Sequence, residues 1–241
     1  MHIPEGYLGP YTYIALFLVM IPIWAYAGYK LNRELKSRQV PLLALSAAFT
    51  FVIMMFNVPV PGGSSGHAVG GALIGIVLGP WAAVVSISVA LILQALLFGD
   101  GGVTAIGANC FNMAVVMPFV AYYTYRIISG KSEITSGRRI LAAAIAGYIS
   151  LSVAAGLTGF MFGIQPYLHQ DAGGRPLYMP YGLEVTVPAM LAEHMLFFSI
   201  LEGIITALVF AYIARTDIVG QLYGEKKAVA KKVSPSGSTT S

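Results

Sequence analysis

The stretch AVGGALIGIVLGPWAAVVSISVALILQALLF, residues 68–98, decides the fold of this chain. It contains no charged residue and is longer than an ordinary membrane-spanning helix, since about 20 residues cross the ~30 Å hydrocarbon core of a bilayer. Gly79-Pro80 interrupts it, and proline removes a backbone donor and ends or kinks a helix. The stretch is therefore either one long span or two short spans divided at Gly79-Pro80.

The composition of the whole chain identifies its class. Of its 241 residues, 57% are hydrophobic and only 10% are charged, and the mean hydropathy is +0.75. A soluble globular domain contains about 25% charged residues, so the composition excludes an ordinary water-soluble enzyme and predicts a multi-pass membrane protein. The single Cys110 excludes an intrachain disulfide and a cysteine-built metal cluster. The apolar blocks are 11–29, 40–60, 68–78, 81–98, 103–128, 140–163 and 187–214.

The basic residues distinguish between one span and two. They gather in two loops, 30–38 and 126–139, and in the tail after residue 214. Because Lys and Arg concentrate on the cytoplasmic side of membrane proteins, these regions share one side, which requires two crossings within 68–98. The sequence therefore predicts an all-α membrane protein, a polytopic bundle of seven transmembrane helices with a short third one, the N-terminus outside and the C-terminus cytoplasmic. Thirteen of the 14 Lys and Arg residues then face the cytoplasm, so the net charge of +4 reflects sidedness and no nucleic-acid partner is expected.

Ionisable and amide side chains within the apolar blocks are candidates for function, because a charge in lipid is costly. Asp100 lies in the turn GDGG (99–102), and Gln94 and Asn109 flank this turn at similar distances, which places both amides near the outer surface. His67 opens the short third span from the same side. We expect these groups to converge just below the extracellular surface. The other candidates, which structural hydrogen bonding would equally explain, are Asn112, Glu193, His194 and Glu202.

The amino terminus, MHIPEGYLGP (1–10), contains the elements of a metal chelate. A bulky second residue such as His2 generally prevents removal of the initiator methionine, so the mature chain begins with the amine of Met1. That amine, the backbone nitrogen of His2 and its ring Nδ1 close two fused chelate rings on one ion, and His67 can supply a fourth in-plane nitrogen. Such donation favours Ni(II) or Cu(II), which tolerate square-planar geometry, over tetrahedral Zn(II). The chemistry alone leaves open that His2 is an ordinary terminal residue.

Three stretches resemble the CbiM/NikM family, the substrate-binding membrane components of energy-coupling-factor (ECF) nickel and cobalt transporters. They are MHIPEGYLG at the start, HAVGGALIGIVLGPWAA (67–83) and LFGDGGVTAIGANCFNM (97–113). The family start is commonly MHIPDG, so Glu5 is a conservative departure. The resemblance implies that Met1, His2 and His67 bind Ni²⁺ or Co²⁺ as the transported ligand, with no cofactor. It also implies residence in the prokaryotic plasma (inner) membrane, with a transmembrane coupling (T) protein, ATP-binding subunits and, in some systems, a small accessory membrane subunit as partners.

On this interpretation the chain has three parts: a metal-chelating segment 1–10, a single transmembrane domain 11–215 and a cytoplasmic, partly disordered tail 216–241. Proline and glycine residues in the first segment suit the turns that would return Met1 and His2 to the bundle. Gln94, Asp100 and Asn109 are expected to surround the ligands and to fix the ring of His67. His169, in the polar outer loop 164–186, is expected to be solvated.

The chain contains no motif for hydrolysing ATP, since GKS at 130–132 lacks the glycine and the strand of a phosphate-binding loop. The protein is therefore expected to be a transport component rather than an enzyme. Two other functions stay open. A stand-alone proton-coupled metal carrier would use Glu193, His194 and Glu202. An intramembrane serine protease would use Ser65 of GSSG (63–66) with a histidine such as His194.

Overall fold

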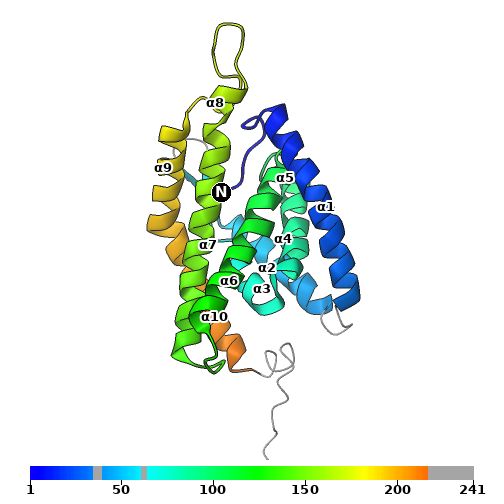
Figure 1. The fold of residues 1–241 in the computed structure, drawn as a ribbon, viewed down its shortest axis with the longest axis vertical. Coiled ribbons are helices and arrows are strands. Elements are labelled where there is room, and N and C mark those ends of the chain that lie inside the picture. Colours follow the sequence, from blue (N-terminus) through cyan, green and yellow to red (C-terminus); the bar gives the residue numbers. More distant parts are fainter. Residues whose placement is uncertain (35–39, 61–63, 217–241) are drawn as a thin grey trace, which may run out of the picture.

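The computed structural model describes residues 1–34, 40–60 and 64–216, which form a bundle of packed helices (Figure 1). The helices are α1 (Pro10–Glu34), α2 (Val40–Met55), α3 (Gly71–Leu78), α4 (Pro80–Leu93), α5 (Ile106–Asn109), α6 (Met117–Ser129), α7 (Gly137–Gly163), α8 (Gln165–Leu168), α9 (Leu183–Glu193) and α10 (Ser199–Ala214). Three π-helical segments, η2 (Gln94–Phe98), η3 (Cys110–Val116) and η4 (His194–Phe198), extend or join them. The strands β1 (Val58–Val60) and β2 (Ser64–Gly66) form a small antiparallel pair.

Within the described residues, five helical stretches are long and apolar enough to cross a membrane. These are Pro10–Glu34, Pro80–Phe98, Ile106–Ser129, Gly137–Leu168 and Leu183–Ala214. Together with α2 and α3 they correspond one by one to the seven apolar blocks, which confirms a multi-pass, mainly helical membrane protein. Because α2 has 16 residues and α3 only 8, the count of seven crossings stays a prediction, as does the placement of the termini.

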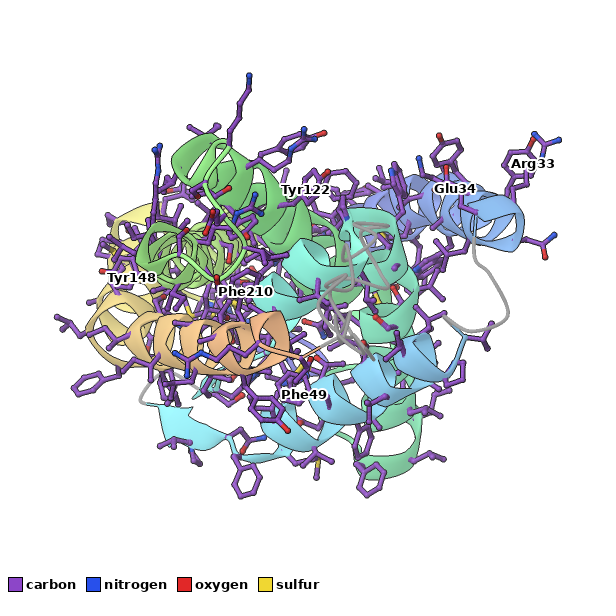
Figure 2. The ribbon with its side chains drawn as sticks, turned by 90° about the horizontal axis from the view of Figure 1, so that it is seen from below. Arg33, Glu34, Phe49, Tyr122, Tyr148 and Phe210 are labelled. Carbon is purple, nitrogen blue, oxygen red and sulfur yellow. The ribbon has the colours of Figure 1, made fainter. Side chains whose placement is uncertain are left out.

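Apart from Arg175, the basic residues of the described chain gather at one end of the bundle. Arg33 lies in the last turn of α1 and Arg126 in the last turn of α6, and Arg138 and Arg139 begin α7. These helix ends lie together at the bottom of Figure 1, and Arg33 and Glu34 lie at the edge of the same end in Figure 2, whereas the loop that contains Arg175 projects from the opposite end. This segregation is the one expected from the positive-inside bias. Residues 35–39 and 217–241, which hold the remaining basic clusters, lie outside the described residues.

The second helix ends earlier than predicted. The apolar block 40–60 was expected to form one span followed by a loop, but α2 ends at Met55 and Val58–Val60 pairs with Ser64–Gly66. Pro59 explains the difference, because it has no backbone N–H to donate within a helix and it disfavours helical geometry at the residue before it. The hairpin leads the chain directly to His67.

The break between the third and fourth helices is confirmed at Gly79-Pro80. Gly79 has φ +88°, a conformation that favours glycine, and Pro80 is the first residue of α4. Gly75 packs against α6 so closely that a Cβ there would lie 2.8 Å from the carbonyl oxygen of Pro118. Residues 71–76 are all buried, so neighbouring helices enclose the short α3. Its enclosure fixes the place of His67, which lies four residues before the first residue of α3.

Candidate metal site

The amino-terminal segment runs from the start of α1 into the interior of the bundle (Figure 1). Met1 and Ile3 are fully buried and His2 is 3% exposed. Asn109 holds this segment through both of its amide atoms: its Oδ1 accepts from the Ile3 N–H (2.8 Å) and its Nδ2 donates to the Ile3 carbonyl (3.2 Å). The Gly102 N–H donates to the same carbonyl at 2.8 Å. The amino terminus of the chain is therefore anchored inside the protein.

The ring of His2 is oriented by Gln94. Its Nε2 lies 3.2 Å from Oε1 of Gln94, whose Nε2 donates to the carbonyl of Phe51 at 3.3 Å. Because the amide oxygen only accepts, Nε2 of His2 carries the proton and Nδ1 presents its lone pair. This buried Nδ1 has no hydrogen-bond partner, although Oδ1 of Asp100 lies 3.4 Å away. The orientation leaves free the ring nitrogen that a chelate with the terminal amine requires.

His67 presents its other ring nitrogen to the same place. The side chain is fully buried, and Nδ1 donates to the carbonyl of Ala68 at 3.1 Å, so Nε2 is unprotonated and has no hydrogen-bond partner. The centroids of the His2 and His67 rings are 4.5 Å apart. Two imidazoles from distant parts of the sequence thus meet beside the amino terminus, each with a bare nitrogen.

Burial keeps these nitrogen donors uncharged. Desolvation lowers the pKa of the Met1 amine to about 5 and the pKa of His2 to about 3. The pKa of His67 is also lowered well below its ordinary value, first by burial and then by the neighbouring positive charge of the amine. Their lone pairs are consequently available near neutral pH, as metal binding requires.

The residues predicted to surround the ligands lie in the site, but against a different histidine. Gln94 and Asp100 contact His2 rather than the ring of His67, and Asn109 holds Ile3. Asp100 is itself held by Asn57, whose Nδ2 donates to Oδ2 at 3.3 Å, and burial raises the pKa of Asp100. They do not fix the ring of His67 as expected, because they contact residues of the amino-terminal segment, and Nδ1 of His67 donates to the carbonyl of Ala68.

The side chains of the described residues do not form a conventional metal cluster. In residues 1–34, 40–60 and 64–216 there is no group of three or more His, Cys, Asp or Glu side chains able to hold an ion. Two imidazoles, those of His2 and His67, lie together at this place. The Met1 amine and the adjoining His2 amide are the backbone groups beside them.

Two other polar residues named from the sequence, Asn112 and His194, form hydrogen bonds away from this site. Asn112 donates to Oγ1 of Thr158 at 2.9 Å and links two helices, which is the structural role considered for it. His194 is fully buried; its Nδ1 donates to the carbonyl of Met190 at 3.0 Å and its Nε2 has no partner. In the described part of the chain no hydrogen bond joins His194 to Ser65.

His169 is not solvated as expected. Its side chain is 7% exposed, its ring stacks on Tyr11 with a centroid distance of 5.0 Å, and its Nε2 accepts from the Tyr11 N–H. Gly9 lies against the same ring, and its N–H donates to Oε1 of Gln165 at 2.9 Å. These contacts fix the start of α1, a part of the structure that sequence analysis missed because they join residues about 160 positions apart.

Comparison with known proteins assigns the chain to a family. Residues 2–218 match the model of CbiM, described as the cobalt uptake substrate-specific transmembrane region. The chain belongs to the CbiM family. Its fold is that of a crystal structure of a transition metal transporter, which is 47% identical with a TM-score of 0.85 over 90% of this chain and 94% of the other. A truncated transition metal transporter is 48% identical with a TM-score of 0.84 over 88% and 98%. The resemblance seen in the sequence is confirmed.

Several curated relatives of this CbiM family member are larger proteins. The fused nickel transport protein NikMN of Rhodobacter capsulatus is 49% identical over 90% of this chain and 62% of the relative. The probable fused nickel transport protein LarMN of Lactiplantibacillus plantarum is 46% identical over 89% and 65%. The chain thus spans less than two thirds of these two relatives. A putative metal transport protein of Methanocaldococcus jannaschii is 45% identical over 89% of this chain and 92% of its own length.

Proposed function

We propose that this protein is the substrate-binding component of an ATP-driven ECF-type transporter for the uptake of Ni²⁺ or Co²⁺. The observation that carries this proposal is the convergence of three buried, uncharged nitrogen donors, the Met1 amine, Nδ1 of His2 and Nε2 of His67, the two ring nitrogens having no hydrogen-bond partner. An unpaired polar atom in a protein interior is costly, and a metal ion would satisfy both ring nitrogens. The names of the relatives support nickel or cobalt as that ion.

The chemistry of these donors favours a planar complex. The amine and Nδ1 of His2 flank the His2 amide nitrogen, so that all three bind one ion in two fused chelate rings, and Nε2 of His67 completes the plane. The ion displaces the amide proton, and strong in-plane nitrogen donation stabilises a square-planar d⁸ centre such as Ni(II). Zn(II), which prefers a tetrahedron, is disfavoured by the same arrangement.

Uptake requires energy that this chain does not supply, because its sequence has no ATP-binding motif. We propose a transmembrane coupling (T) protein and ATP-binding subunits as partners, in a prokaryotic plasma membrane. The additional length of the fused relatives supports a small accessory membrane subunit as a further partner. The cation enters from the side opposite the basic helix ends, where the amino-terminal segment docks, and leaves toward the cytoplasm when the partners separate the two ligand segments.

The free amine provides the sharpest test. A peptide ending in a specific protease site is fused directly before Met1, so that cleavage regenerates the native terminus in the same preparation. We expect no tight nickel binding before cleavage. In the fusion the Met1 nitrogen belongs to a peptide bond and is no longer a free amine, and the buried terminus has no room for added residues. After cleavage, binding and a yellow, diamagnetic nickel spectrum are expected to appear.

The matched control carries the same peptide after Ser241 and is expected to bind nickel with or without cleavage. Tight binding by the uncleaved amino-terminal fusion would overturn the ligand assignment. The alternative, a stand-alone proton-coupled carrier, is supported by Nε2 of His194, which has no hydrogen-bond partner, and by Oε1 of Glu193, which lies 3.8 Å from Nδ1 of His194. Nickel uptake in cells that lack any ATPase partner would support that alternative.

A further inference from the structure

The turn that presents His67 is fastened by a buried carboxylate on another helix. Glu202 of α10 is fully buried, and its Oε2 accepts hydrogen bonds from the Val69 N–H (2.8 Å) and the Gly70 N–H (2.9 Å). Its Oε1 lies 3.4 Å from the N–H of Ala72, in the first turn of α3. The first N–H groups of a helix have no partner within the helix and attract negative charge. Glu202 satisfies this need from 130 or more residues away in the sequence.

The same turn is held on its other side by α2. The hydroxyl of Thr50 donates to the carbonyl of Val69 at 2.5 Å. Gly70 has φ +73° and lies against the ring of Phe49, which is labelled between α2 and α10 in Figure 2, so a larger residue would not fit there. The backbone of residues 68–70 is thus clamped between two helices.

The orientation of the His67 ring depends on this clamp. Its Nδ1 donates to the carbonyl of Ala68, which belongs to the peptide unit whose N–H, that of Val69, donates to Glu202. One peptide group therefore connects the imidazole to the carboxylate. If this peptide rotates, the proton on Nδ1 loses its acceptor and the direction of Nε2 changes.

We propose that Glu202 is a positioning residue for metal binding, which holds the 68–72 backbone so that Nε2 of His67 points at the amino terminus. The proposal rests on the proposed function, because it assumes His67 as a ligand. It assigns a role to a carboxylate that does not itself reach the metal.

A double-mutant cycle tests whether Glu202 acts through His67. Glu202→Gln keeps the size of the side chain but places an NH₂ group against backbone N–H donors. We expect nickel affinity of the purified full-length protein to fall roughly 10- to 100-fold, the usual effect of losing a partner that orients a ligand. In the His67→Phe background the same substitution is expected to change affinity less than about twofold, because coupled residues are not additive. Glu184→Gln, on the exposed first turn of α9, is the matched control and is expected to have no effect.

The outcomes separate this inference from the proposed function. Equal losses in both backgrounds, or unchanged affinity in well-folded E202Q, would overturn the positioning role alone. Unchanged affinity in H67F would overturn the ligand assignment and the positioning role with it. Should E202Q fail to fold, Thr50→Val loosens the same turn with little change in volume. Thr50→Val is expected to weaken nickel binding roughly three- to tenfold. An equal loss in the H67F background would contradict the positioning role.

Discussion

The two halves of the candidate site are held in different ways. Met1–Ile3 is held by neutral groups from a single part of the chain, residues 94–109, through the amide side chains of Gln94 and Asn109 and the backbone of Gly102. The His67 turn is held by the carboxylate of Glu202, with Thr50 on its other side, and these two come from helices far apart in sequence. Each half therefore has an anchor of its own.

This difference indicates how capture and release can be separated. On the proposed ligand assignment, the amino-terminal half would bring three nitrogen atoms as one chelate and would supply most of the affinity. On the same assignment, the His67 half would bring a single nitrogen on a turn that contacts α2 through Thr50 and α10 through Glu202, so loosening these contacts would remove one ligand and leave the chelate intact. A cation bound between the two halves would join them, so substitutions in one half can be compared with substitutions in the other.

His2→Phe is expected to produce the largest loss of nickel affinity, about 1000-fold or ~4 kcal/mol. The substitution removes Nδ1 and with it one of the two fused chelate rings, whereas a bulky second residue still retains Met1. Alanine would be a poor choice, because a small second residue permits removal of the initiator methionine. Competition titration in detergent or nanodiscs measures the effect.

His67→Phe is the comparison for this prediction. It removes one nitrogen and leaves the chelate, so the expected loss is about 100-fold. A larger loss for H67F than for H2F would reverse the assignment of the two halves. Loss of the planar nickel spectrum is expected in both variants.

Asn109→Leu ranks next, because it removes the two hydrogen bonds between Asn109 and Ile3, keeps only the one from Gly102 to the Ile3 carbonyl, and leaves the buried Ile3 N–H without an acceptor. We expect the free energy of unfolding to fall by about 1–3 kcal/mol and nickel affinity to fall roughly 10- to 100-fold. Asn112→Leu is a matched amide control, since Asn112 bonds to Thr158 instead. It is expected to cost stability but not affinity, and equal affinity losses in the two variants would show that Asn109 acts only through general stability.

The helices were largely predictable from the sequence, because each apolar block is long enough to identify by itself. The break at Gly79-Pro80 followed from the distribution of Lys and Arg together with the properties of proline. The hairpin 58–66 was missed, because its apolar residues continue the pattern of α2 and only Pro59 marks the change. A single proline near the end of an apolar block does not by itself distinguish a shortened helix from a kinked one.

The contents of the site were predictable, but the pairing within it was not. Counting residues along helices correctly brought Gln94, Asp100 and Asn109 to the depth of His67. Such counting gives the depth of a residue along the bundle axis but not the neighbour that its side chain faces. These groups were therefore assigned to His67, although they contact the amino-terminal segment. Glu202 was recognised only as a buried acid. Its partners are backbone N–H groups, which every residue except proline carries, so no pattern of side chains in the sequence predicts this contact.

Gln94→Met is expected to weaken nickel binding about tenfold. Methionine has a similar volume but offers no strong acceptor to the Nε2 proton of His2, so the ring loses the hydrogen bond that fixes its tautomer and angle. Gln94→Glu restores an acceptor and is expected to recover most of the affinity. If Q94E binds nickel no better than Q94M, the affinity depends on the hydrogen bond that Gln94 donates to the Phe51 carbonyl and not on the one that it accepts from His2.

His169→Ala is expected to have the smallest effect on the site, a change in nickel affinity of less than about twofold. His169 contacts Tyr11 and Gly9 at the start of α1, whereas Met1–Ile3 is held separately by residues 94–109. The lost stacking and hydrogen bond should lower the free energy of unfolding by about 1 kcal/mol, measurable as a reduced thermal midpoint. A loss of affinity comparable with that of N109L would mean that the amino-terminal half is anchored through α1 as well, and that this half of the site is less independent than its hydrogen bonds indicate.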